Sequence, residues 1–316
     1  MMLKKIIILF FAAAVCVKQP SRAEVDTSIG EFLRINPSVA SSALGNAGAA
    51  LRGPAGYVFL NPALPELKKS GSSQINTSYT GWLSGTKLMN VLAAHSPDGN
   101  AAFGAGVSFF SSGEMERFDA GGNELSGDFQ IKDFLFSPFY GKNITEKLRG
   151  GVSAKVVSID NVNNRKILFA AGIGGVYSLS KCLTAGVSLQ NAGPGVEIGG
   201  SRYALPRLLK AGIGWKIRSN VTAMADIEYP YDDSIKAGIE WRLKEKVKLR
   251  CGYDKTAGLK SGAGLTAGLG FEIASRDSME ELATGRSVPV LLLFDYAFQN
   301  FGELGYIHRV SFGIHY

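Results

Sequence analysis

From residue 73 to the C-terminus, polar and apolar residues alternate along segments of about ten residues. In the segment 263–273, every second residue is alanine, leucine, phenylalanine or isoleucine, and the residues between them are mostly glycine. A period of two with one apolar face is typical of a half-buried β-strand. The alternation predicts strands at 73–82, 86–96, 100–112, 127–140, 147–159, 166–178, 183–191, 207–217, 220–229, 234–243, 246–254, 262–273, 289–298 and 306–316.

Strand length separates a membrane barrel from a soluble sandwich, which would show the same alternation. Strands of soluble proteins are typically ~5–6 residues long, whereas membrane-spanning strands need ~9–11. In hydrocarbon, only helices or a closed barrel satisfy every backbone polar group. Aromatic residues near strand ends on the apolar face fit a girdle at the membrane interface; they are Tyr229, Trp241, Tyr253, Tyr296 and Tyr316. We therefore predict an all-β protein, a transmembrane antiparallel β-barrel of about 14 strands.

The polar face of these strands carries both glycines and charges. The chain has 39 glycines among 316 residues, about 12 %, against a usual ~7 %, and glycine permits close approach of another backbone. The predicted lumenal polar lining comprises Lys210, Asp226, Glu228, Lys236, Glu240, Arg242, Arg250, Glu272, Asp295 and Arg309, and Lys155 shares their face. Such charges need partners. They either cross-link strands and hold an inserted segment, or line the path of a translocated ligand.

The connections between strands differ in length. Long ones at 113–126, 192–206 and 299–305 alternate with mostly tight ones, as expected for outer loops and periplasmic turns. The long connection 274–288 is an exception on the periplasmic side, and its capping-box pattern at 278–281 predicts a short helix.

The first 23 residues have the features of a signal peptide. Lys4 and Lys5 precede an apolar core at 6–17, and small residues flank a cleavage site after Ala23. A lipoprotein signal ending at Cys16 is the weaker alternative. We therefore expect export to the outer membrane of a diderm bacterium, with a linker and plug, or hatch, segment at 24–71 and the barrel at 72–316.

The stretch 36–67 does not alternate and is rich in small residues. Asn36 and Pro37 fit the N-cap and first position of a helix, which glycines at 45 and 48 would then break. We expect this stretch to fill the barrel. The predicted plug element comprises Tyr57, Phe59, Leu60, Asn61, Pro62 and Ala63.

Enzyme signatures are absent from the sequence. It contains no His-Glu-x-x-His, Gly-x-Ser-x-Gly or phosphate-loop motif, so we expect no enzyme, cofactor or metal site. Residues 24–316 hold 30 Lys and Arg against 27 Asp and Glu, a net charge of +3 that argues against a nucleic-acid partner. Cys182 and Cys251 remain after cleavage; they could pair, but small apolar strand positions are the simpler interpretation.

Several motifs along the chain, taken in order, resemble those of one family. They are SALGNAGAAL at 42–51, LNPALPEL at 60–67, QNAGP at 190–194, FDYAF at 294–298 and HRVSFGIHY at 308–316. Together they resemble the PorV/PorQ family of outer-membrane barrels, relatives of the fatty-acid transporter FadL. The resemblance implies a fourteen-stranded barrel with an N-terminal plug. It also implies that the last strand, with Phe312 and Tyr316, is the signal read by the barrel-assembly machinery.

Two functions follow from this resemblance, and a structural role is a third. The first is an accessory or cargo-shuttle component of type IX-like protein secretion, with secreted proteins or the translocon as partners at the loops 113–126 and 192–206. The second is a FadL-like conduit for hydrophobic small molecules such as fatty acids, with Leu291 and Leu293 facing inward. In each case we expect a monomer surrounded by outer-membrane lipid.

Overall fold

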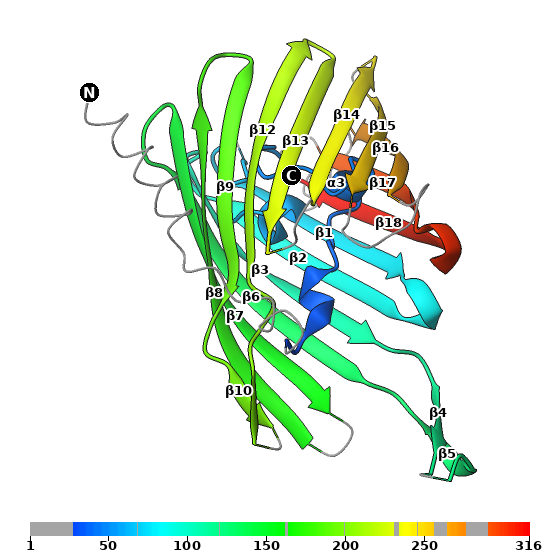
Figure 1. Ribbon diagram of the computed structural model, residues 1–316. Helices are drawn as coiled ribbons and strands as arrows, with labels where there is room; N and C mark the ends of the chain where they lie inside the picture. The colour runs from blue at the N-terminus through cyan, green and yellow to red at the C-terminus, as the bar shows by residue number, and fades with distance from the viewer. Residues whose placement is uncertain are drawn as a thin grey trace.

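Among the described residues, fourteen antiparallel strands close into a barrel (Figure 1). The computed structural model describes residues 28–67, 69–119, 121–161, 164–198, 200–230, 234–244, 246–255, 264–275 and 290–316. Strands neighbouring in the barrel follow chain order, and β1 (Ser72–Gly81) pairs with β18 (Tyr306–His315) to close it. The predicted fold class is confirmed. The other barrel strands are β2 (Lys87–Ser96), β3 (Ala101–Ser111), β6 (Lys132–Asn143), β7 (Leu148–Asn161), β8 (Asn164–Ser178), β9 (Leu183–Ala192), β12 (Leu208–Arg218), β13 (Val221–Tyr229), β14 (Ile235–Leu243), β15 (Val247–Lys255), β16 (Leu265–Ser275) and β17 (Val290–Asn300).

Two small hairpins extend the same end of the barrel (Figure 1). One pairs β4 (Met115–Phe118) with β5 (Glu124–Phe129), and the other pairs β10 (Val196–Ile198) with β11 (Ser201–Tyr203). The sequence predicted loops at 113–126 and 192–206 and a barrel strand that begins at 127. That boundary was wrong, because 124–129 pair with β4 and the barrel strand begins at Lys132. Alternation shows that a segment is extended, but it does not show which neighbour the segment pairs with.

The two faces of each barrel strand have different surroundings. Trp215 and Phe169 point outward with 51 % and 60 % of their surface exposed, whereas alternate residues of the same strands are buried. An apolar outer face of this kind is what strands need when they cross hydrocarbon. Among the described residues, no helix is long and apolar enough to cross a membrane.

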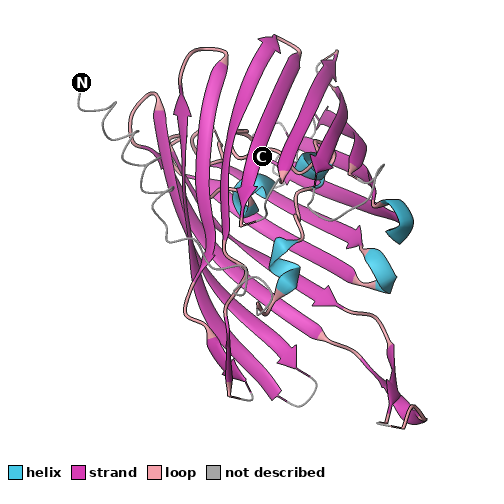
Figure 2. Cartoon of the chain, in the orientation of Figure 1, coloured by secondary structure: helices cyan, strands magenta, loops and turns pink. Residues whose placement is uncertain are grey.

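Residues 28–67 form a segment that lies within the ring of strands, and we call it the inner segment (Figure 2). Its short helices are η1 (Glu31–Arg34), α3 (Val39–Ser42) and η2 (Ala55–Phe59); η3 (Leu83–Gly85) and η4 (Gly302–Leu304) lie in connections between strands. The helix start predicted at Asn36 was two residues early. Ser38 is the N-cap of α3, and its hydroxyl accepts from the Ser41 N–H at 3.4 Å. Asn36 instead accepts from the Ser38 N–H, which forms a turn before the helix.

Glycines on the inner face of the strands let the inner segment approach the barrel backbone. A Cβ on Gly174 would lie 1.9 Å from the Asn61 Oδ1, and one on Gly186 would lie 2.1 Å from the Ala49 carbonyl oxygen. No real side chain tolerates such distances, so only glycine fits. These contacts give the glycine-rich strand face a physical cause. The predicted signal peptide and the predicted helix at 278–281 lie outside the described residues.

Candidate functional site: the barrel interior

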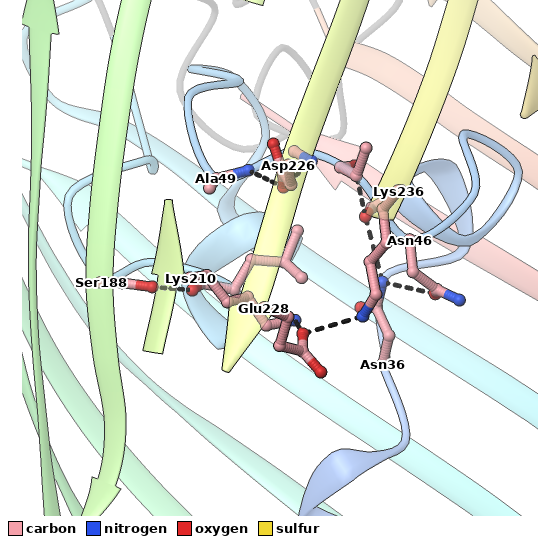
Figure 3. Close-up of polar contacts among 12 residues, drawn as sticks. Asn36, Asn46, Ala49, Ser188, Lys210, Asp226, Glu228 and Lys236 are labelled. Atoms are coloured by element: carbon pink, nitrogen blue, oxygen red, sulfur yellow. Dashed lines mark hydrogen bonds and ion pairs between the residues drawn. The ribbon is translucent and has the colours of Figure 1, made fainter. Parts of the chain in front are cut away.

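A chain of ion pairs joins three neighbouring strands inside the barrel. The Glu228 carboxylate on β13 accepts from the Lys210 ammonium on β12 at 2.7 Å and from the Lys236 ammonium on β14 at 2.8 Å (Figure 3). All three side chains are more than nine-tenths buried. Lys210 and Glu228 are directly opposite each other in the β12–β13 register, so the pair follows from strand alternation once the register is set.

Other carboxylates of the barrel hold the inner segment. The Asp226 Oδ2 accepts from the Gly48 and Ala49 backbone N–H groups at 2.7 and 2.8 Å. The Asn46 amide donates to the Asp254 Oδ2 at 2.7 Å and accepts from Asn36 at 3.0 Å (Figure 3). A carboxylate that accepts two backbone N–H groups is a strong anchor, because charged hydrogen bonds are about twice as strong as neutral ones.

A second group of charges lies further round the barrel. Arg250 donates to the Glu240 Oε2 at 2.8 Å and pairs with Asp295, while Lys248 pairs with Glu272. Arg309 is fully buried. Its guanidinium donates to the side-chain Oε1 of Gln299 at 2.8 Å and lies 5.3 Å from the Trp82 ring centroid.

Most of the predicted lumenal residues are therefore brought together as cross-links between strands and as anchors of the inner segment. Arg242 differs from the rest. It lies next to the last residue of β14 and is exposed, because the strand ends before the side chain can be covered. Leu293 is buried, as its predicted inward orientation requires.

The predicted plug element is buried except for the half-buried Phe59, and it is bonded to β8 and β9. The Asn61 side chain, with no exposed surface, donates to the Ala49 carbonyl at 2.9 Å and to the Gly175 and Val187 carbonyls at 3.3 Å. Its Oδ1 accepts from the Ala63 N–H at 3.0 Å, which sets the turn around Pro62. Burial raises the pKa of the Tyr57 phenol above its ordinary value, against the opposing effect of Arg250, so the phenol stays neutral.

An apolar cluster lines the inside of the barrel at the end that carries the two hairpins. Its wall residues lie near the hairpin ends of β2, β6, β7 and β8, and Phe32 of η1 packs against them with its ring 5.7 Å from that of Phe110. We call this set the apolar end cluster; it comprises Phe32, Ile35, Leu88, Leu135, Val157, Ile159, Leu168, Ala170 and Leu205.

Sequence reasoning missed this cluster. The available signal was local loss of alternation, since Val156–Val157 and 167–170 are apolar on both faces. A strand in a water-filled pore has one polar face, so apolar residues on both faces indicate that the interior is apolar at that height.

A small cavity borders the apolar end cluster. It has a volume of about 30 Å³ and is lined by Phe32, Ile35, Phe59, Leu88, Leu135 and Leu208, with Lys155 and Lys210 among its polar residues. The Lys155 ammonium donates to the Gln190 Oε1 at 3.0 Å and to the Asn191 Oδ1 at 2.6 Å. Both acceptors are neutral amides, and within the described residues Lys155 forms no ion pair.

The remaining candidate residues lie on the outer face or at its edges. Phe312 and Tyr316 are exposed, and the Tyr316 N–H donates to the Ser73 carbonyl at 3.0 Å across the closing pair of strands. Cys182 and Cys251 are free and exposed. Among the described residues, no group of His, Cys, Asp and Glu could hold a metal ion.

The chain matches no protein-family model and no curated protein. Its fold is similar to solved structures of transporters. The Ralstonia pickettii toluene transporter TbuX superposes with a TM-score of 0.58 at 13 % identity, over 88 % of this chain and 97 % of that one. The monoaromatic hydrocarbon channel CymD gives 0.57 at 13 %, over 89 % and 97 %, and a Pseudomonas aeruginosa FadL homologue gives 0.55 at 11 %, over 88 % and 98 %. At these identities the similarity shows the fold: a FadL-like fourteen-stranded barrel.

Proposed function

We propose that this protein is an outer-membrane channel for hydrophobic small molecules that carry an anionic head group. The observation on which this rests is the apolar end cluster. The interior of a porin-type barrel is polar, whereas here Leu88, Leu135 and Leu168 face inward and are buried at one end of the barrel. An apolar inner wall gives a hydrophobic solute a surface to partition onto before it meets the charges further along.

The buried lysines suggest the head group. Lys155 contacts neutral amides, and the cavity that it lines with Lys210 also has apolar walls, among them Leu88, Leu135 and Leu208. A buried ammonium without an opposite charge is costly, and an anionic ligand would supply that charge. A carboxylate at the end of an apolar chain matches both the wall and the cation.

The inner segment would act as the plug in this proposal. A cavity of about 30 Å³ is far below the ~300–1,000 Å³ of a typical ligand site, so the described conformation is a closed one. Entry of a ligand requires the residues 32–37, which line the cavity, to move away from Leu88 and Leu135. Asp226 and Asn61 hold the rest of the segment in place during such a movement.

The comparisons favour a conduit over a secretion component. Solved structures with a similar fold include those of toluene and monoaromatic hydrocarbon transporters and of a FadL homologue. A secretion role rests on the resemblance of the motifs between 42 and 316 to the PorV/PorQ family. Normal export of surface proteins in a deletion strain would exclude it.

The test is ligand binding by the purified protein in liposomes, with a fluorescent C16 fatty acid and toluene as probes. A Lys155→Met variant loses the charged contact, worth about 1.5–3 kcal/mol for a hydrogen bond to a charged group, and should bind the fatty acid at least tenfold more weakly with toluene unaffected. Lys87→Met, at an exposed lysine of β2, is the control. If the wild-type protein binds neither probe, the proposed function is wrong.

A further inference from the structure

Among the described residues from β6 to β15, the end of the barrel opposite the two hairpins carries an excess of positive charge. Exposed basic residues occupy the strand ends and tight turns from β6 to β15; they are Lys142, Lys147, Lys181, Lys216, Arg218, Arg242, Lys244 and Lys246. Within the described residues of these turns, Glu146 is the one acidic side chain. Neither the interior ion pairs nor the proposed channel function accounts for this asymmetry.

Three of these cations, Lys147, Lys181 and Lys216, line a recess at this end of the barrel. The recess has a volume of about 810 Å³, which is within the range of ligand sites. Its walls come from the inner segment, at 50–52 and Glu66, and from the ends of the strands and turns around it. Among its lining residues, Arg52, Lys147, Lys181 and Lys216 are basic, and Glu66 and Glu146 are acidic.

The guanidinium groups near the recess are only partly compensated. The Arg52 NH1 lies 3.8 Å from the Glu66 carboxylate, and the buried Arg52 Nε has no hydrogen-bond partner. Arg149, almost fully buried below, donates to backbone carbonyls such as that of Ala63 at 2.9 Å. An unpaired buried N–H group is destabilising, so an anionic group that accepts from it at this mouth would be stabilised.

We propose that this recess is a docking site for an acidic segment of a soluble periplasmic protein. The position of the recess favours a polypeptide over a membrane lipid. Gly214 and Thr184 of its wall belong to the inner face of the strands, and the Thr184 hydroxyl donates to the Ala50 carbonyl of the inner segment at 3.3 Å. Lipid head groups surround the outer circumference of a barrel, whereas this recess opens at the mouth of its lumen.

Charge complementarity also sets the expected behaviour of the complex. Attraction between an acidic segment and exposed lysines acts mainly on the rate of association, and it is screened by salt over a Debye length of ~8 Å at physiological ionic strength. Binding should therefore weaken steeply as salt is raised. A site that recognised apolar residues would not show this dependence.

The first experiment measures binding of a fluorescein-labelled decaglutamate peptide to the full-length protein in nanodiscs of a zwitterionic lipid. The variant Lys147→Glu/Lys181→Glu/Lys216→Glu should lose at least tenfold in affinity. The control Arg117→Glu/Arg202→Glu/Lys255→Glu reverses three exposed charges at the opposite end and should bind as the wild type does. Equal affinities of the two variants would overturn the proposal.

The second experiment uses Cys182, which lines the recess, to locate the peptide. In a Cys251→Ser background, a glutamate peptide that carries an activated disulfide should label Cys182 at least tenfold faster than a neutral peptide does. The triple variant Lys147→Glu/Lys181→Glu/Lys216→Glu should remove this difference in rate. Equal labelling by the two peptides would refute docking at this place. Anionic-lipid vesicles that abolish peptide binding would assign the cations to lipid instead. These variants leave Lys155 and the apolar end cluster unchanged, so their outcome is independent of the fatty-acid test.

Discussion

The close approach of Asn61 to Gly174 provides the sharpest test of how the barrel and the inner segment are held together. A Cβ at position 174 would lie 1.9 Å from the Asn61 Oδ1 and 2.7 Å from its Cγ. The Asn61 side chain cannot rotate away freely, because it is fully buried and bonded to the Ala49 carbonyl and to two strand carbonyls. A Gly174→Ala substitution must therefore displace the turn at 61–63.

The expected cost has two parts. Overpacking of a well-filled interior costs about 1–3 kcal/mol, and each buried hydrogen bond lost by Asn61 adds about 1 kcal/mol. The matched control is Gly81→Ala, also in a strand, where the new Cβ would meet nothing closer than 3.9 Å. That change should be neutral or slightly stabilising, because alanine loses less backbone entropy than glycine on folding.

The assay is unfolding in guanidinium chloride of protein folded in detergent, followed by the gel shift between folded and unfolded barrels. Gly174→Ala should unfold at a clearly lower denaturant concentration than Gly81→Ala. Adding Asn61→Gly to Gly174→Ala should recover part of the lost stability, because it removes the clash. A double-mutant cycle measures this recovery as a coupling energy between the two positions. If Gly174→Ala and Gly81→Ala unfold together, the packing argument is wrong.

Four further outcomes are expected. Deletion of 36–67 should give a barrel that is less heat-stable and conducts ions, whereas unchanged heat stability and conductance would refute the plug assignment. Arg250→Ala should lower the free energy of unfolding in the same assay by about 3–5 kcal/mol, because Glu240 and Asp295 lose their buried partner. A decrease of less than about 1 kcal/mol would contradict this. In liposomes, a membrane-impermeant maleimide should label Cys182 but not Cys251, because Cys251 lies on the outward face of β15, where lipid would cover it. Labelling of both cysteines would show that lipid does not cover this part of β15. The Asn123 side chain and backbone N–H groups hold the pKa of Asp119 below its usual value. The β4–β5 turn is therefore stabilised above the ordinary aspartate pKa and loses this stabilisation as the pH falls through the lowered pKa. Protection factors for amide exchange at Gly121 and Asn123 that stay the same across this pH range would exclude it.

The sequence predicted the barrel strands well because a membrane strand must satisfy two local conditions at once. It must be long enough to cross the hydrocarbon, and it must be apolar at every second position. Both are visible in the order of residues, as in 209–217, which the structure places in β12. Where those conditions lapse, at 124–129, the predicted boundary was wrong.

The interior was predicted less completely. The sequence placed Lys210, Glu228 and Lys236 on one face, but their ion pairs depend on the register of β12, β13 and β14. The apolar end cluster joins η1 to four strands that come much later in the chain. The resemblance to a known family did not indicate this cluster. A contact of this kind is set by barrel closure and not by any local pattern.

The sequence by itself therefore determined the class of fold, because alternation, strand length and glycine on one face are local consequences of crossing a membrane around a filled interior. The tertiary structure decided what fills that interior and how it is held. It shows the Asp226 carboxylate accepting from two backbone N–H groups, Asn61 packed against Gly174, and Lys155 in contact with neutral amides beside a small cavity. Each of these contacts joins residues more than thirty positions apart, so they exist only once the strands have closed.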